Sequence, residues 1–131
     1  MERFAQGDCI NKRKVGTTYE QKAAEYLTEK EYQILETNYR NRYGEIDLVA
    51  RDRRAAGRPI VFVEVKYRRN ASYGVPQEAV NGRKQRKIIS VAWFYLKMHG
   101  CGYDTPCRFD VITICGDHIE HIENAFYGAM I

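Results

Sequence analysis

The segments Gly44-Glu45-Ile46-Asp47-Leu48-Val49 and Val61-Phe62-Val63-Glu64-Val65-Lys66 decide the fold of this chain. Apolar and charged residues alternate in both segments, which predicts two β-strands that each bury one face. The buried faces are expected to hold Ile46, Leu48 and Ala50 in the first strand and Val61, Val63 and Val65 in the second. The opposite faces then carry Glu45 and Asp47 in the first strand and Phe62, Glu64 and Lys66 in the second.

Three charged side chains of these strands are expected to meet. If both apolar faces rest on one core, Asp47, Glu64 and Lys66 emerge on the same side of the sheet. Two carboxylates beside an ammonium group suit a Mg²⁺ or Mn²⁺ ion and phosphodiester hydrolysis. The carbonyl of Val65 offers a further ligand, and Lys66 can orient or deprotonate the water or stabilise the transition state. An ordinary ion pair of Glu64 and Lys66 on a half-exposed sheet is the alternative.

A fourth acidic residue is a candidate for the same site. A helix is expected to begin near Thr17 or Thr18 and to bury a stripe formed by Ala23, Ala24 and Leu27. Glu20 falls on this stripe, where an acid is costly unless it is paired or bound to a metal ion. The alternative is a first-turn glutamate that the helix dipole favours.

The basic residues are unevenly placed. Seven of them lie between Lys66 and Lys87, against one acid, Glu78. Asn81 is expected to cap a helix that runs to about His99 and carries four of these cations in its first turns, where a phosphate group is also favoured. A nucleic-acid backbone is therefore the expected partner, and a merely solvated surface is the alternative. The expected contact residues are Arg68, Arg69, Arg83, Lys84, Arg86 and Lys87.

The remaining pattern predicts one α/β domain. Strands are expected at 33–39, 108–114 and 118–122, and a short helix at 76–80. The expected order is αβββαβ with a terminal strand, which makes a mixed central sheet flanked by helices. Residues 1–14 are expected to form a flexible tail and residues 15–127 the domain.

Bulk properties narrow the class of protein. The chain has 131 residues, 44% of them hydrophobic, and a net charge of +4, as in a soluble domain. The apolar runs are too short to span a membrane, and the N-terminus lacks a signal-peptide core, so a cytoplasmic protein without membrane contact is expected. Cys9, Cys101, Cys107 and Cys115 have no zinc-site spacing and are expected to be reduced thiols.

The two opening segments resemble the PD-(D/E)xK nuclease signature, with Glu-Ile-Asp47 and Glu64-Val-Lys66 as its elements. More closely, the chain resembles the YraN-like family of bacterial proteins. The matching motifs are Gly16-x-x-x-Glu20, Asn38-Tyr39-Arg40, Gly74-x-Pro76-x-Glu78-Ala79-Val80 and Arg108-Phe109-Asp110-Val111. The resemblance implies a restriction-endonuclease-like core related to Holliday-junction resolvases. It also implies that Asp47 and Glu64 are metal ligands, Lys66 the catalytic lysine and Glu20 the helix acid.

The sequence is therefore interpreted as a Mg²⁺- or Mn²⁺-dependent DNA endonuclease. Resemblance to resolvases makes branched or structured DNA one candidate substrate, and it implies a homodimer because two strands must be cut. Trp93, Phe94 and Tyr95 leave one aromatic side chain beyond a single helix stripe, but no dimer surface is evident. The alternatives are a non-catalytic nucleic-acid-binding module and a subunit of a larger DNA-processing complex.

Overall fold

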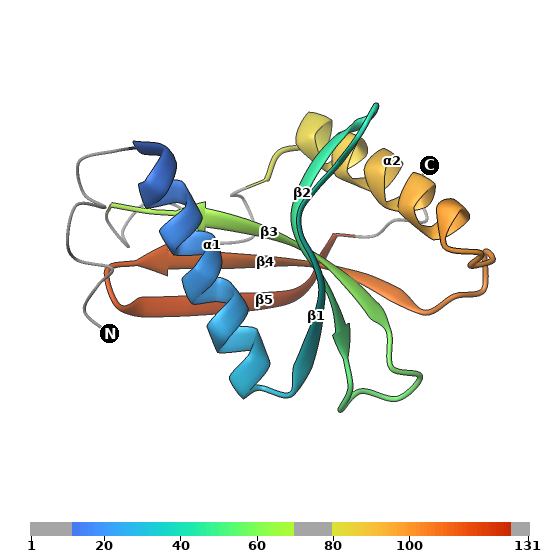
Figure 1. Cartoon of the computed structure of the whole chain (residues 1–131), viewed down its shortest axis with the longest axis horizontal. Helices are drawn as coiled ribbons and strands as arrows, with labels where there is room; N and C mark the ends of the chain where they lie inside the picture. Colours follow the sequence, from blue (N-terminus) through green and yellow to red (C-terminus); the bar gives the residue numbers. More distant parts are fainter. Residues whose placement is uncertain (1–11, 70–79, 127–131) are drawn as a thin grey trace.

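A five-stranded mixed sheet between two helices forms the core of the protein, as Figure 1 shows. The computed structural model describes residues 12–69 and 80–126. The predicted short helix at 76–80 therefore lies almost wholly outside the described residues, as do most of the N-terminal tail and Cys9. The elements are α1 (Lys12–Glu29), β1 (Tyr32–Asn41), β2 (Gly44–Asp52), β3 (Ile60–Tyr67), α2 (Gly82–Met98), β4 (Cys107–Cys115) and β5 (His118–Phe126).

The strands lie in the sheet in their order along the chain. β1, β2 and β3 form an antiparallel meander. The chain then crosses through α2 to β4, which pairs parallel with β3, and β5 returns antiparallel beside β4. The predicted α/β class, the mixed sheet flanked by helices and the αβββαβ order with a terminal strand are confirmed.

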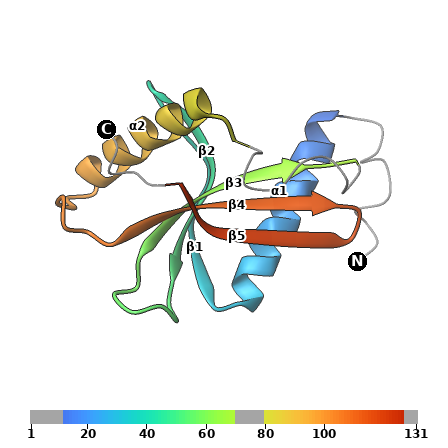
Figure 2. The same cartoon turned by 180° about the vertical axis from the view of Figure 1, so that it is seen from behind.

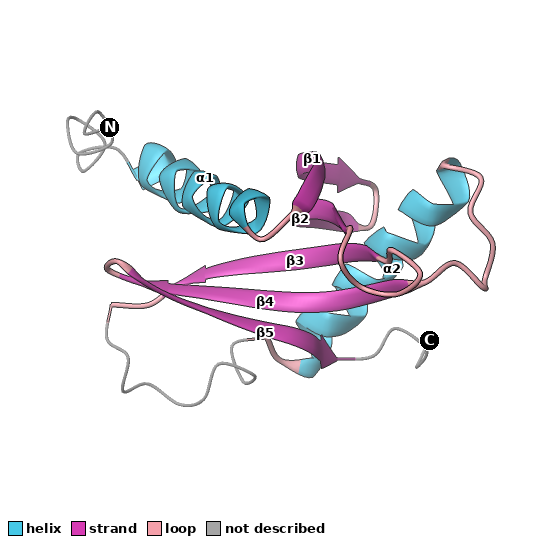
Figure 3. Ribbon diagram, turned by 90° about the horizontal axis from the view of Figure 1, so that it is seen from below, coloured by secondary structure: helices cyan, strands magenta, loops and turns pink. Residues whose placement is uncertain are grey.

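Two apolar layers hold the helices on opposite faces of the sheet. In Figure 3, α1 lies beside one end of β3, and α2 crosses the strands toward their other end. On the α1 side, Ala23 and Leu27 pack against β2, β3 and β4. On the α2 side, the apolar face of α2 packs around Phe62 and Phe109. Because β3 alternates between the two layers, Glu64 lies on the same side as Phe62, facing α2.

α2 begins after Asn81, as predicted, and ends at Met98, close to the predicted end near His99. The side chain of Asn81 accepts a hydrogen bond from the backbone N of Lys84 at 2.9 Å, which satisfies a free donor at the helix start. Gly100 takes a φ of 71°, the left-handed conformation that ends many helices. On the apolar side of α2, Ile88, Ile89, Ala92 and Leu96 are buried and Trp93 is half-buried.

Two local predictions are wrong. α1 begins at Lys12 rather than near Thr17 or Thr18, because the lysine and arginine residues upstream are good helix formers and no proline stops the helix. Ile46 does not share a face with Leu48 and Ala50. It packs in the α2 layer, whereas they pack in the α1 layer. The hairpin of β1 and β2 curls toward α2, where a Cβ on Gly44 would lie 3.4 Å from Val91 (Figures 1 and 2).

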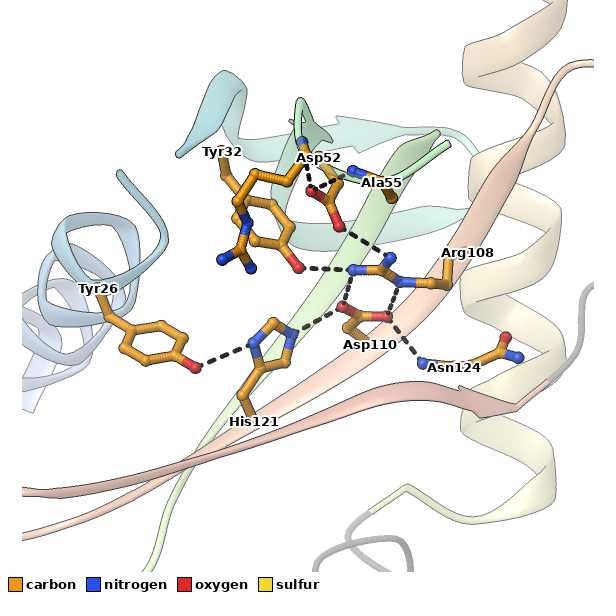
Figure 4. A network of polar contacts seen from close by, with 9 residues as sticks. Tyr26, Tyr32, Asp52, Ala55, Arg108, Asp110, His121 and Asn124 are labelled. Carbon is orange, nitrogen blue, oxygen red and sulfur yellow. Dashed lines mark hydrogen bonds and ion pairs between the residues drawn. The ribbon is translucent and has the colours of Figure 1, made fainter. Parts of the chain in front are cut away.

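A buried polar network joins α1 to four of the strands beneath it (Figure 4). Asp110, which is fully buried, accepts hydrogen bonds from Arg108 Nε and Nη2 at 2.9 Å each. Arg108 also donates to Asp52 at 3.0 Å and to Tyr32 at 2.6 Å. His121 lies 2.7 Å from Asp110 on one side and 3.2 Å from the Tyr26 hydroxyl on the other. Since the Asp110 carboxylate at its centre is fully buried, we assign the network to stability.

No helix in the described part of the chain is long and apolar enough to cross a membrane. The cysteines that the structure describes, Cys101, Cys107 and Cys115, are free thiols.

Candidate functional site

The candidate site lies where β2 separates from β3. The two strands pair from Arg51 opposite Ile60 to Leu48 opposite Val63, and there the pairing ends. Asp47 adjoins Leu48 and Glu64 adjoins Val63, so the two acids stand just beyond the end of the paired segment. In place of a backbone carbonyl, the Asp47 carboxylate accepts the hydrogen bond of Val65 N at 2.8 Å. Asp47 therefore lies where β2 and β3 separate, and a hydrogen bond ties it to the strand that carries Glu64.

Glu64 is a nearly buried acid with two cations beside it. Its residue is 6% exposed, which is unusual for a glutamate. The ammonium group of Lys84 lies 3.0 Å from its Oε2 atom and that of Lys66 lies 3.9 Å from the same atom. Burial and then the charge of Asp47 raise the pKa of Glu64, and the contact with Lys84 opposes the rise.

The pKa of Asp47 is raised to about 6, first by burial and then by the neighbouring carboxyl group of Glu20. The hydrogen bond from Val65 and the charge of Lys84 act in the opposite direction. A carboxyl group this close to neutral pH is held in a place that water solvates poorly and where other acids crowd it. Such an arrangement stores unfavourable electrostatic energy that a bound cation would relieve.

Glu20 approaches Asp47 from the helix. It stands half-buried on α1, one turn before the buried Ala23 and two turns before the buried Leu27, and its carboxyl group raises the pKa of Asp47. That Glu20 points toward both Asp47 and Glu64 stays a prediction, which its effect on the pKa of Asp47 supports. Tyr19, its neighbour on α1, stacks on Tyr67 of β3 with ring centroids 4.3 Å apart, which fixes the helix beside the site.

Lys84 lies beside Glu64, a contact that was not predicted from the sequence. The pattern grouped it with the nucleic-acid contacts of the first turns of α2, but its ammonium group reaches Glu64. One signal was available, because Lys84 stands four residues before the buried Ile88 and so lies on the side of the helix that faces the sheet. Arg83, Arg86 and Lys87 are exposed, as is Arg69, and Arg68 is half-buried.

The donor set is small. Within 12–69 and 80–126, no three His, Cys, Asp or Glu side chains gather in a cage that could hold a metal ion. Mg²⁺ does not need such a cage, because it keeps several waters and is commonly held by one or two carboxylates together with substrate phosphates. Asp47 and Glu64, with the carbonyl of Val65, fit this mode of binding.

Comparison with known proteins finds relatives over most of the chain. The model of the uncharacterised protein family UPF0102 matches residues 19–114. A UPF0102 protein of Lachnoclostridium phytofermentans is 48% identical over 122 residues, which cover 92% of this chain and 100% of the relative. Relatives in Fusobacterium nucleatum and Pectobacterium carotovorum are 39% and 42% identical, cover 91% and 89% of this chain and are themselves covered to 96% and 97%. None of these names states an activity.

Proposed function

The chain belongs to the UPF0102 family, and we propose that it is a divalent-metal-dependent DNA endonuclease with Asp47 and Glu64 as its metal ligands. Membership agrees with the YraN-like resemblance and supplies no activity, so the proposal rests on the site. The observation that carries it is the pair of desolvated carboxylates where β2 and β3 separate: burial raises the pKa of both, the charge of Asp47 raises that of Glu64 further, and Lys66 lies 3.9 Å from Glu64.

The protein groups divide the work of phosphodiester hydrolysis. A bound Mg²⁺ or Mn²⁺ supplies charge relief at the phosphate and orients a water molecule. Asp47 and Glu64 would hold the ion, and the Val65 carbonyl would be a further ligand. Lys66, 33% exposed along its side chain, is free to turn from Glu64 toward the phosphate, where it positions the water or stabilises the transition state. Glu20, whose carboxyl group raises the pKa of Asp47, would complete the metal shell from the helix.

DNA is the proposed polymer because the exposed cations lie at the same end of α2 as the site. Arg83, Arg86 and Lys87 follow the Asn81 cap, and Arg68 and Arg69 continue β3 beyond Lys66. Their positions suit the phosphates on either side of the scissile bond. Branched or structured DNA and a homodimeric enzyme belong to this proposal through the resemblance to resolvases.

A non-catalytic DNA-binding module is the second candidate, and the place of Lys84 favours it. Its ammonium group lies 3.0 Å from Glu64 and supplies a permanent positive charge where a metal ion would lie. If Lys84 stays paired with Glu64 when DNA is bound, the protein binds DNA without cutting it. The same ion pair is also compatible with an enzyme. In the metal-free protein it would balance the charge of Glu64, and a metal ion would replace the ammonium group on binding.

Incubation of the full chain with plain, nicked, flapped and four-way DNA tests the proposal. Cleavage in Mg²⁺ or Mn²⁺, absent in EDTA and in Ca²⁺, is expected on at least one of these substrates. Calcium serves as the control because it binds carboxylates with a looser geometry. Binding to these DNAs without cleavage in either metal would establish the binding module instead.

Metal affinity should depend on pH, with the midpoint of the change near the pKa of Asp47. Because the pKa of Asp47 is raised to about 6, a metal ion must displace a proton from the site below that pH. Lowering the pH from about 7 to about 5 should weaken Mn²⁺ binding by about tenfold. Calorimetric titration in buffers of different ionisation enthalpy measures both the affinity and the proton released. A Mn²⁺ affinity that stays constant over this range would contradict the assignment of Asp47 as a ligand.

The two adjacent cations of α2 should behave differently toward DNA. Arg83→Ala is expected to reduce the slope of log affinity against log salt by about 1, as for one lost phosphate contact. Lys84→Ala should leave the slope nearly unchanged, because Glu64 already neutralises that ammonium group. Fluorescence anisotropy of a labelled duplex over a salt series measures both. Equal slopes for the two variants would mean that Lys84 faces the phosphates as Arg83 does.

A further inference from the structure

A second surface of the protein lies away from the carboxylates, between the tip of the β1–β2 hairpin and the far half of α2. It is a groove of about 950 Å³, a volume in the range of ligand-binding sites. We call it the α2 groove and define it by Arg42 and Tyr43 of the hairpin, Trp93, Phe94 and Lys97 of α2, and Tyr103 of the following loop.

Aromatic rings dominate the α2 groove. Tyr43 and Phe94 lie with ring centroids 5.8 Å apart, and Trp93 and Tyr103 lie 5.3 Å apart. Within the described residues, two of the four exposed large apolar side chains are in it, Tyr43 at 42% and Tyr103 at 91% exposure. A cluster of exposed rings of this kind marks a binding surface in a soluble protein.

The charges of the α2 groove select its ligand. The residues that line it include two cations, Arg42 and Lys97, and no carboxylate. The Arg42 guanidinium group lies 5.3 Å from the centre of the Tyr43 ring, so a planar cation and a ring stand together. Rings that can stack on bases, interleaved with cations that can meet phosphates, are the elements of a surface for single-stranded nucleic acid.

The helix connects this surface to the candidate site. At 100° per residue, Arg83, Lys87, Ser90, Phe94 and Lys97 fall on one side of α2. The stripe leads from the basic first turns to the groove over a length of about 21 Å. A second copy of the chain is a less suitable occupant, because it would bring the same cations toward this stripe.

We propose that the α2 groove binds unpaired nucleotides of the DNA whose backbone lies at the Asp47–Glu64 site, an inference that rests on the proposed function for its polymer. Bases inside a duplex are stacked on each other and cannot stack on side chains, whereas the bases of a flap, a gap or a single-stranded end can. The groove would thereby direct the protein to DNA that carries a single-stranded segment.

The test separates bases from phosphates. Two labelled oligonucleotides of about 12 units are compared in EDTA by anisotropy, one of thymidine and one with an abasic backbone of equal charge. The thymidine strand should bind about tenfold or more tightly than the abasic strand. It should also quench the fluorescence of Trp93, the one tryptophan of the chain.

The double variant Tyr43→Ala/Tyr103→Ala should remove this preference, and both side chains are exposed enough to be replaced without loss of folding. Met98→Ala is the matched control, an exposed apolar residue of α2 that does not line the groove. Equal affinity of the wild type for both strands would overturn the inference. So would a concentration-dependent dimer that the double variant abolishes, since a second copy would then occupy the groove.

The measurement is independent of catalysis. If the protein prefers the thymidine strand in EDTA but cuts no DNA, the proposed function is contradicted and nucleotide binding in the α2 groove is supported. If the protein cuts DNA but binds both strands equally, the proposed function is supported and nucleotide binding in the α2 groove is contradicted.

Discussion

Replacing Asp47 by asparagine is expected to abolish metal-dependent cleavage and, at the same time, to stabilise the folded chain above about pH 6. The loss of activity should be about a hundredfold or more, since a metal ligand is removed from the reacting centre. The gain in stability follows from the raised pKa of this carboxyl group. Opposite signs of the two effects are typical of residues kept for activity at the expense of stability.

The sign of the stability effect follows from proton binding. The folded chain holds the Asp47 proton up to about pH 6, whereas the unfolded chain releases it near pH 4. Between these values the folded state binds more protons, so the free energy of unfolding falls as the pH rises. Above about pH 6 the charged form costs on the order of 1–3 kcal/mol, which asparagine does not incur. Its amide oxygen can still accept the hydrogen bond of Val65 N, so no buried donor is left without a partner.

Urea denaturation at pH 7 and at pH 4, together with cleavage assays, measures both effects. Glu45→Gln is the matched control, because Glu45 lies two residues away on the same strand, is exposed and pairs with Arg40 at 3.1 Å. It should change neither property appreciably. Lys66→Ala provides the comparison within the site, since it should remove cleavage while metal binding remains. Full activity of Asp47→Asn would rule out the metal role, and lower stability at pH 7 would refute the electrostatic account.

The side of the sheet on which Glu64 lies was predictable from the sequence, because it depends on period-two alternation in β3. The alternation of Glu64 with Val63 and Val65 places its side chain on the α2 side of β3, and helical spacing places Glu20 with Ala23 and Leu27. These relations are local, so they survive errors in the positions of the elements. The mixed sheet likewise follows from the helix between β3 and β4, which gives a parallel pair.

The features that escaped prediction depend on how distant segments meet. The face of Ile46 could not be inferred, because the curl of the hairpin toward α2 overrides the alternation that holds for Leu48 and Ala50. The contact of Lys84 with Glu64 depends on the angle at which α2 crosses the sheet. The α2 groove needs the hairpin tip, the helix and the loop after it together, and nothing in the spacing of Tyr43 and Tyr103 indicates that they are near each other.

The Asp110 network is the clearest such case. Arg108 and Asp110 alternate along β4 with Phe109, which suggests a polar strand face open to water, yet Asp110 is fully buried. The face is covered because Tyr32, Asp52 and His121 converge on it from β1, β2 and β5. Within the described residues, no buried side-chain nitrogen or oxygen atom lacks a hydrogen-bond partner. The cost of desolvating these charges is therefore offset by contacts formed only in the complete fold.

Asp110→Ala should therefore destabilise the protein strongly without touching the candidate site. Removing the carboxylate leaves the buried Arg108 guanidinium group with one acidic partner, Asp52, and removes the acceptor for the Asn124 backbone N–H, which lies 2.9 Å away. Breaking one partner of a buried ion pair costs about 3–5 kcal/mol, since an uncompensated charge remains. The midpoint of urea denaturation at pH 7 should fall accordingly, with the slope of the transition unchanged.

Asp117→Asn is the matched control for this prediction. Its carboxylate lies 3.9 Å from the ammonium group of Lys22 but is fully exposed, so its loss should leave the midpoint nearly unchanged.

The pH dependence tests the cause of the effect. Burial alone would raise the pKa of Asp110, but the hydrogen bonds from His121 and Arg108 hold it below its ordinary value. A lowered pKa contributes stability that is present above about pH 4 and is lost as the pH falls through the folded value. The stability advantage of wild type over Asp110→Ala should therefore shrink in acid, whereas the disadvantage of wild type relative to Asp47→Asn should disappear there. A difference that stays constant down to about pH 2 would mean that Asp110 stabilises the fold by packing alone, without the charge that Arg108 and His121 enclose.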